Sequence, residues 1–286
     1  HIFENKERVI EETVVLRIRT LAIPPAWTEV WICKQANGHL QATGRDAKGR
    51  KQYRYHAKWN LARNETKFAK LLQFGEILPQ VRTQVEKDLK RPGLPREKVV
   101  AAVIKLMELM RIRIGNDQYA QENDSYGLTT ILNEHARVRG KRIQFKFKGK
   151  SGVAHDVLLA DARLSHIVSR CQDLPGEELF GFEDDDGVTH DIGSADVNDY
   201  LQNITGLAVT AKDFRTWHGT VKAVKEFAAL GPRPKVLSQR AEKTRICGVI
   251  KEVAAYLRNT VSVCRKYYIH PAVTAADEDG FLHKAY

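Results

Sequence analysis

The sequence predicts an α+β protein that has a small β-rich N-terminal domain and a larger, mainly helical domain with a small β-sheet. Two patterns predict this class. Short alternating or apolar runs fill roughly the first seventy residues, and long segments with apolar residues at helical spacing follow them. A chain of 286 residues is also long enough to give each of two domains a packed core. We place the boundary at the Leu78-Pro79 pair, so the expected domains are residues 1–78 and 79–286.

The first domain is expected to be a small sheet. The runs "VVLRIRTLAIPPAW" (14–27) and "KQYRYH" (51–56) alternate in polarity, and "EVWICK" (29–34) and "HLQATG" (39–44) are short enough for strands. Asn37-Gly38 is a strong hairpin signal, and "RDAKGR" (45–50) is a second polar turn. Strands therefore alternate with turns through this part of the chain.

The second domain is expected to be mainly helical. A helical pattern begins near Asn60, and the breaker "RPGLP" (91–95) separates it from "REKVVAAVIKLMELMRIRIG" (96–115), an apolar core helix that Gly115 would cap. A β interlude follows in "GLTTIL" (127–132), "KRIQFKFKG" (141–149) and "GVAHDVLL" (152–159), with "GKSG" as the turn between the last two. Further helices are expected in residues 161–174, 194–206, 210–230 and 238–260, and "EDDDG" (183–187) is expected at a solvated hairpin tip.

Charge is the most informative part of the composition. The formal net charge is +11, and Lys and Arg displace the counterions that condense on nucleic acid. The cations cluster between residues 45 and 70, where Tyr53, Tyr55 and Trp59 are interleaved with them. Composition alone leaves two interpretations open, a nucleic-acid partner and an ordinary basic protein.

Other classes of protein are disfavoured. No apolar run reaches membrane-spanning length, because Lys105 and Glu108 interrupt the longest one. No signal peptide is visible, and the start at His1 suggests a trimmed or tagged N-terminus. The four cysteines lack CxxC spacing, which suggests free thiols in a reducing cytoplasm. The sequence has no GxxxxGK[ST] loop and no HxxxH or HExxH spacing, so neither a nucleotide cofactor nor a metal is expected.

Two adjacent tyrosines lie in a basic segment near the C-terminus, "SVCRKYYIHPAV" (262–273). A tyrosine phenol, with a pKa of about 10, can attack a phosphodiester when cations stabilise the phenolate and the doubly charged transition state. Such cations would have to converge from several elements. The candidates are Arg113, Lys150, Arg215, Arg258, Arg265 and Lys266. Taken singly, each is better explained as a solvated surface charge.

Five segments together resemble type IB DNA topoisomerases, in the short form of poxviruses and bacteria. "IRIGN" (112–116) is similar to the block of the first catalytic arginine, "FKFKGKSG" (145–152) to the lysine hairpin, and "KDFRTW" (212–217) to the second arginine block. "NTVSVCRKYYIHP" (259–271) is similar to the nucleophile block, and "RKQYRYHAKW" (50–59) to the segment that contacts the major groove. The segments span most of the chain in the family's order, which makes the resemblance specific.

The resemblance implies a set of catalytic residues. These are Arg113, Lys150, Arg215, Asn259 and Tyr268.

The choice between the two tyrosines comes from a spacing within the nucleophile block. Poxviral enzymes have a His nine residues before the tyrosine. Nine residues before Tyr268 lies Asn259, as in bacterial members, whereas the same count from Tyr267 reaches Arg258. Tyr268 is therefore the expected nucleophile, and Asn259 is expected to be an uncharged donor to a phosphate oxygen.

The same resemblance implies the fold and the reaction. The fold would be that of type IB topoisomerases and tyrosine recombinases, in a monomer that clamps double-stranded DNA. The reaction would relax supercoiled DNA without ATP or metal, through single-strand cleavage, a 3′-phosphotyrosyl intermediate, strand rotation and religation. The two arginines would bind the non-bridging oxygens, and Lys150 would protonate the leaving 5′-oxygen. The bacterial type of donor suggests a place in the cytoplasm, at the bacterial nucleoid.

Further residues match positions at which the family contacts DNA. An edge strand with exposed aromatic side chains would explain three of them as well, and a surface role would explain the others. They are Gln52, Tyr53, Tyr55, Arg63, Tyr119 and Lys212.

Two alternatives to a topoisomerase are considered. A tyrosine recombinase shares the nucleophile and the arginines, but that family has a His three residues before the second arginine, where this chain has Lys212, and its N-terminal module is helical. A non-catalytic DNA-binding protein would need no tyrosine nine residues after Asn259. Both alternatives fit the sequence less well.

Overall fold

The computed structural model confirms the α+β class. It describes the backbone of residues 3–4, 7–234 and 236–285, and their side chains except at 3–4, 7–8, 63–65, 119, 151 and 284–285. The chain divides into two compact units, His1–Ala69 and Lys70–Tyr286. The division falls inside one helix, α2 (Ala57–Asp88), and not after residue 78.

The first unit contains a three-stranded antiparallel sheet in the order β3-β4-β5. The hairpin predicted at Asn37-Gly38 is present, and the buried side chain of Gln41 holds it by donating from Nε2 to the carbonyls of Gln35, Ala36 and Gly38 at 3.0, 3.2 and 2.7 Å. The elements are β1 (Phe3–Glu4), β2 (Glu7–Arg8), α1 (Glu12–Thr20), β3 (Thr28–Ile32), β4 (Leu40–Arg45), β5 (Lys51–Tyr55) and the start of α2.

The strand expected from residue 14 is wrong, because α1 covers that segment. Val14, Val15 and Ile18 are spaced for a helix as well as for an alternating strand, so the pattern alone was ambiguous. A contact distant in sequence fixes the helix: Arg17 donates to the carbonyl of Cys33 and to Oε1 of Gln41, both at 2.8 Å.

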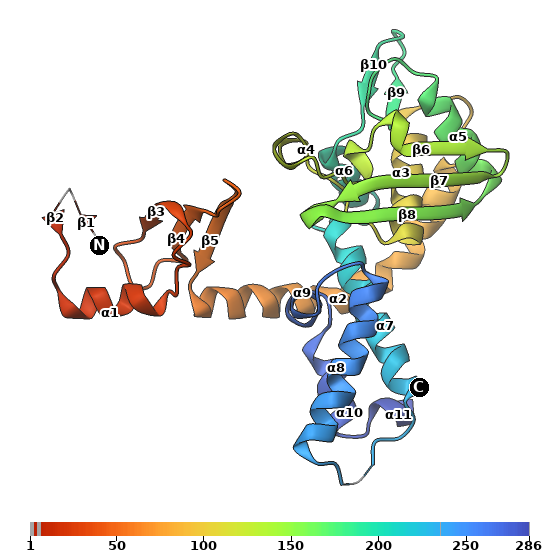
Figure 1. Ribbon diagram of the computed structural model, residues 1–286. Coiled ribbons are helices and arrows are strands. Elements are labelled where there is room, and N and C mark those ends of the chain that lie inside the picture. Colours follow the sequence, from red (N-terminus) through yellow and green to blue (C-terminus); the bar gives the residue numbers. More distant parts are fainter. Residues whose placement is uncertain (1–2, 5–6, 235, 286) are drawn as a thin grey trace. The chain divides into compact units, whose positions relative to one another are not determined.

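The second unit combines helices with a three-stranded antiparallel sheet, β6-β7-β8, and the hairpin β9–β10 (Figure 1). Its helices are the rest of α2, α3 (Arg96–Met110), α4 (Asp117–Asn123), α5 (Ala162–Gln172), α6 (Ser194–Thr205), α7 (Ala211–Ala229), α8 (Gln239–Tyr256), α9 (Val261–Tyr267), α10 (Pro271–Glu278) and α11 (Leu282–Ala285). Its strands are β6 (Ala136–Arg139), β7 (Arg142–Gly149), β8 (Val153–Ala160), β9 (Gly181–Glu183) and β10 (Thr189–Asp191).

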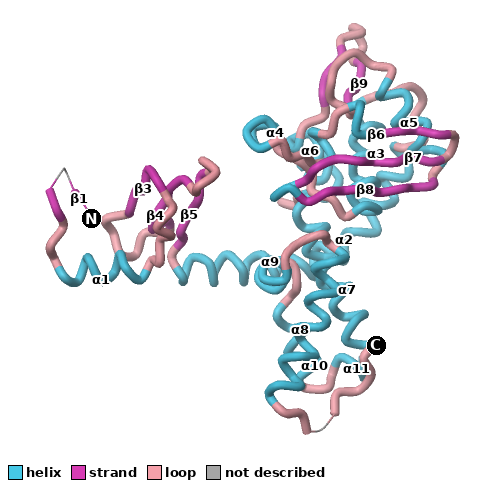
Figure 2. The backbone as a smooth tube through the Cα atoms, in the orientation of Figure 1, coloured by secondary structure: helices cyan, strands magenta, loops and turns pink. Residues whose placement is uncertain are grey.

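Two hydrophobic clusters organise the second unit, and α7 contributes to both. Ala211 and Phe214 belong to the cluster of α2, α3, α5 and the inner face of β6–β8. Ala223 and Phe227, two to four turns further along, belong to the cluster formed with α8, α9 and α10. Figure 2 shows α7 between the sheet-bearing part and the all-helical part of this unit. Residues near the middle of α7 therefore lie where the clusters meet.

The sequence located most elements of the second unit, with three corrections. The core helix ends at Met110 and not at Gly115, because Arg111 adopts the left-handed backbone (φ 57°) that caps it. The expected strand in 127–132 is a 3₁₀ turn, Leu128–Thr130. The last long helix stops at Tyr256. A separate short helix, α9, follows and ends at Tyr267, so Tyr268 is the residue after it.

Within the part of the chain that the structure describes, no helix has the length and apolar character needed to cross a membrane.

Gly75 of α2 packs against Trp217 of α7, where a Cβ would lie 2.4 Å from the indole ring. Gly→Ala within a helix ordinarily stabilises by about 1 kcal/mol, but overpacking a core costs about 1–3 kcal/mol. We expect Gly75→Ala to lower the free energy of unfolding in urea denaturation. Gly248 of α8 is the matched control, because a Cβ there meets nothing within 4 Å, and Gly248→Ala should raise stability by about 0.5–1 kcal/mol. Equal gains in both variants would contradict this packing.

Candidate active site

A cavity of about 460 Å³ in the second unit brings together most of the residues expected to be catalytic. Its lining includes the tyrosine, both arginines and two lysines, from α7, the end of α9, the β7–β8 turn and the loop after α3. They are Arg113, Lys150, Lys212, Arg215 and Tyr268. The sequence places these residues up to 155 positions apart (113 to 268), so the fold alone makes them neighbours.

Arg113 lies on the loop after α3, and the "GLTT" segment holds this loop. The amides of Leu128 and Thr129 donate to the carbonyls of Arg113 and Ile114 at 3.0 and 2.6 Å. Glycine is required at 127, since a Cβ there would lie 2.4 Å from the Cα of Gly115. The segment expected as a strand thus serves to support Arg113.

Arg215 is buried, with 4% of its surface exposed. Its NH1 donates to the carbonyl of Arg111, and its NH2 donates to the carbonyl of Leu257 at 2.9 Å. These carbonyls follow the ends of α3 and α8 respectively. The guanidinium is therefore fixed in place, which lowers the reorganisation needed when charge develops nearby.

Tyr268, the residue after α9, rests its backbone on α7 one turn beyond Arg215. A Cβ at Gly219 would lie 2.5 Å from the carbonyl oxygen of Tyr268, so only glycine permits this approach. The Thr220 hydroxyl donates to the same carbonyl at 3.4 Å. The guanidinium carbon of Arg215 lies 5.1 Å from the centre of the Tyr268 ring.

The environment of Tyr268 favours its phenolate. The side chain is 7% exposed, and this burial raises the pKa of Tyr268. The positive charges of Arg215 and Arg113 and a hydrogen bond from Arg215 lower the pKa by more, so it lies below the ordinary value of tyrosine.

Lys150 lies at the hairpin tip, as the sequence predicted. β7 ends at Gly149, a single 3₁₀ turn covers Lys150–Gly152, and β8 begins at Val153. The amide of Tyr126 donates to the carbonyl of Lys148 at 2.8 Å, which ties the hairpin to the segment that supports Arg113.

Asn259 is not among the described residues that line the cavity. Its Oδ1 accepts from the amide of Thr260 at 3.0 Å. Its Nδ2 is buried without a hydrogen-bond partner among the described residues. The donor group of this side chain is thus held back from water while its acceptor is occupied.

The residues expected to contact DNA fall into three groups. Lys212 lines the cavity and is among the cations that lower the pKa of Tyr268. In the first unit, Tyr53 and Tyr55 stack on the exposed side of edge strand β5, with ring centres 6.2 Å apart, and Gln52 donates to Asp46 at 3.0 Å. The side chains of Arg63 and Tyr119 lie outside those that the structure describes.

Three residues of this region, Asn116, Tyr126 and His155, were not identified as site residues from the sequence. Asn116 and Tyr126 line the cavity. His155 is buried on β8. Arg258, one of the candidate cations predicted from the sequence, follows α8 in a left-handed conformation (φ 48°) and donates to the carbonyl of Met110 at 3.2 Å. His155 could have been found from the hairpin register, since it pairs with the inward-facing Phe147.

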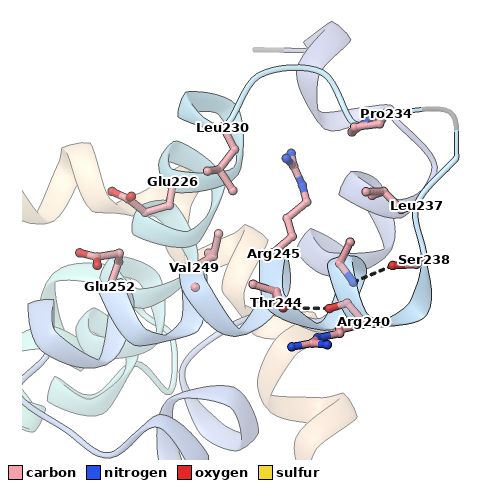
Figure 3. A pocket seen from close by; sticks show the side chains of 12 residues that line it. Glu226, Leu230, Pro234, Leu237, Ser238, Arg240, Thr244, Arg245, Val249 and Glu252 are labelled. Atoms are coloured by element: carbon pink, nitrogen blue, oxygen red, sulfur yellow. Dashed lines mark hydrogen bonds between the residues drawn. The ribbon is translucent and has the colours of Figure 1, made fainter.

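A larger cavity of about 750 Å³ lies between the end of α7 and the start of α8 (Figure 3). No tyrosine is among the described residues that line it, and its Arg245 is bound to both carboxylate oxygens of Asp277 at 2.8 and 2.9 Å. Among the described side chains, no group of three or more His, Cys, Asp or Glu could hold a metal ion.

Comparison with known proteins identifies the class as the DNA topoisomerases. Residues 50–279 match the family described as eukaryotic DNA topoisomerase I, catalytic core, and residues 2–46 match the bacterial DNA topoisomerase IB N-terminal domain. The chain therefore belongs to the type IB DNA topoisomerase family, and it is an enzyme of that type.

Viral relatives agree with this assignment. DNA topoisomerase 1B of Acanthamoeba polyphaga mimivirus is 29% identical over 94% of this chain and 81% of its own length. DNA topoisomerase 1B of vaccinia virus (strain Copenhagen) is 22% identical over 92% of this chain and 81% of its own length.

The electrostatic role of Arg113 can be tested on the phenol itself. Arg113→Gln removes a charge that stabilises the phenolate, so the pKa of Tyr268 should rise, and cleavage should slow by about 10²–10³-fold. The pKa is measured by NMR titration of ¹³Cζ-labelled tyrosine, with the resonance assigned through Tyr268→Phe. Arg137→Gln removes an equal charge from the exposed face of β6 and should leave this pKa unchanged. An unchanged pKa in Arg113→Gln would refute the electrostatic role.

Proposed function

We propose that this chain relaxes supercoiled duplex DNA by using Tyr268 as the nucleophile. The observation that carries the proposal is the cavity in which Arg113, Lys150 and Arg215 meet around Tyr268. A phosphodiester bound there would lie among three cations and beside a phenol whose pKa is lowered. Tyrosine attack on phosphorus needs both conditions.

The proposed reaction conserves the phosphodiester energy. The phenolate oxygen of Tyr268 attacks the scissile phosphorus in line, the new O–P bond forms, and the bond from phosphorus to the 5′-oxygen breaks. Lys150 gives its proton to the departing 5′-oxygen as general acid. The phenol's own proton goes to solvent, which the lowered pKa favours. After the free strand end rotates, the 5′-hydroxyl attacks the 3′-phosphotyrosyl bond and restores the backbone.

The arginines are proposed to stabilise the charge on the non-bridging oxygens. Two of the five N–H donors of Arg215 are already committed to carbonyls, so its position is set before the phosphate arrives. Asn259 is proposed as the uncharged donor to the same oxygens, through its buried Nδ2. Neither ATP nor a metal ion has a role in these steps.

The two units are proposed to act as a clamp around DNA, as a monomer. The first unit would contact the major groove through Gln52, Tyr53 and Tyr55, and the sequence resemblance adds Arg63, Tyr119 and Lys212 as contacts near the backbone. For Gln52 to read a base edge, its hydrogen bond to Asp46 would have to open. The bacterial type of N-terminal domain supports action at a bacterial nucleoid.

Substitution of each tyrosine in turn tests the proposal. Tyr268→Phe should abolish relaxation of supercoiled plasmid and the covalent DNA adduct, both assayed in EDTA without ATP, while salt-sensitive DNA binding survives. Tyr267→Phe is the matched control and should retain both activities. Mass spectrometry of the trapped DNA–peptide adduct should locate the link at Tyr268. An adduct that persists in Tyr268→Phe and disappears in Tyr267→Phe would overturn the assignment.

A further inference from the structure

His155 is a buried polar residue beneath the turn that carries Lys150. It lies on β8 and is 7% exposed. Its Cα pairs with that of Phe147 on β7, and the two rings stack with their centres 4.8 Å apart and their planes at 11°. The imidazole thus occupies an inward-facing position in the sheet, next to the hairpin tip.

The ring is in direct contact with the residue before Lys150. A Cβ built on Gly149 would lie 2.5 Å from Nε2 and 2.7 Å from Cδ2 of His155. The backbone of Gly149 has φ −92° and ψ −172°, which any residue can adopt. Glycine is therefore needed at this position because of the imidazole and not because of the turn.

The positive charges of the site also act on this ring. Burial, and after it the positive charges of Arg258, Arg113 and Arg215, together lower the pKa of His155 to about 4. The imidazole is consequently neutral at physiological pH and adds no charge to the cavity. Its Nδ1 is buried with no hydrogen-bond partner among the described residues, a cost that an apolar side chain would not bring.

We propose that His155 is a positioning residue for Lys150: its ring supports the backbone at Gly149 and so sets where the Lys150 ammonium meets the leaving 5′-oxygen. This inference rests on the proposed function of Lys150 as the general acid. A flat five-membered ring fits between Phe147 and Gly149, and a smaller side chain would let the turn sink toward the sheet. A displacement of about 1 Å is enough to cost roughly 10²-fold in rate.

The test separates protonation of the leaving 5′-oxygen from every other contribution to the cleavage rate. It uses a duplex with one cleavage site, mapped from the trapped adduct, made with either oxygen or sulfur at the bridging 5′-position. A thiol has a pKa near 8.5, so a thiolate departs without a proton, whereas an alkoxide needs one. Single-turnover cleavage is measured on both duplexes with the full-length protein.

We expect His155→Ala to cleave the oxygen duplex about 10²-fold more slowly than wild type and the sulfur duplex within a few-fold of it. Lys150→Ala should show the same selectivity with a loss of about 10²–10⁴-fold on oxygen. Arg113→Gln is the contrasting control, because it acts on the non-bridging oxygens and should lose rate equally on both duplexes.

A pair of substitutions that should compensate each other distinguishes a specific effect on the turn from misfolding. Gly149→Ala should also slow cleavage of the oxygen duplex selectively, since its methyl group and the imidazole cannot share the space. The double variant Gly149→Ala/His155→Ala should cleave faster than Gly149→Ala alone, because the removed ring leaves room for the methyl.

The outcomes distinguish this inference from the proposed function. If Lys150→Ala is equally slow on oxygen and sulfur, the general-acid role falls and the inference with it. If sulfur rescues Lys150→Ala but not His155→Ala, or if His155→Ala cleaves oxygen at the wild-type rate, the inference alone is wrong. The inference is also wrong if the rate losses of Gly149→Ala and His155→Ala multiply in the double variant.

Discussion

The buried guanidinium of Arg215 is the interaction on which the rest of the site depends. It joins the carbonyl of Arg111, after α3, to the carbonyl of Leu257, after α8, and its carbon atom lies 5.1 Å from the centre of the Tyr268 ring. A buried charge without such partners costs several kcal/mol, so the three segments must be in place together. The charge proposed to bind phosphate is thus also the charge around which the site assembles.

The backbone near this guanidinium is strained, and side-chain contacts of the strained residues stabilise it. Arg111 and Arg258 both adopt the left-handed conformation, which costs about 1–2 kcal/mol for a residue other than glycine. Arg258 donates to the carbonyl of Met110, and the guanidinium of Arg111 lies 4.2 Å from the centre of the Tyr256 ring. Both helix ends therefore turn sharply toward each other, and this brings Arg113 and Asn259 to the same region of the second unit.

Local patterns predicted the elements whose signals are local. Alternating Phe and Lys with a Gly-rich turn located the Lys150 hairpin, and the helical pattern expected in 194–206 is α6, which ends before the left-handed Gly206. The predictions were wrong where contacts between residues distant in sequence determine the local structure. Arg111 ends α3 in a conformation that arginine rarely adopts, and the "GLTT" segment bonds to the Arg113 loop instead of forming a strand. His155 was missed because its role depends on the register across the hairpin. The resemblance predicted Tyr268 and its cations as site residues, but no local signal indicates that they share one cavity.

The membership of α7 in both hydrophobic clusters has a consequence for the order in which site and fold are lost on unfolding. Arg215 keeps its two carbonyl partners only while both clusters are intact, because one partner follows α3 and the other follows α8. Local opening of either cluster takes place at a lower free energy than global unfolding. When either cluster opens, the protein thus loses the proposed catalytic arrangement before it loses its fold.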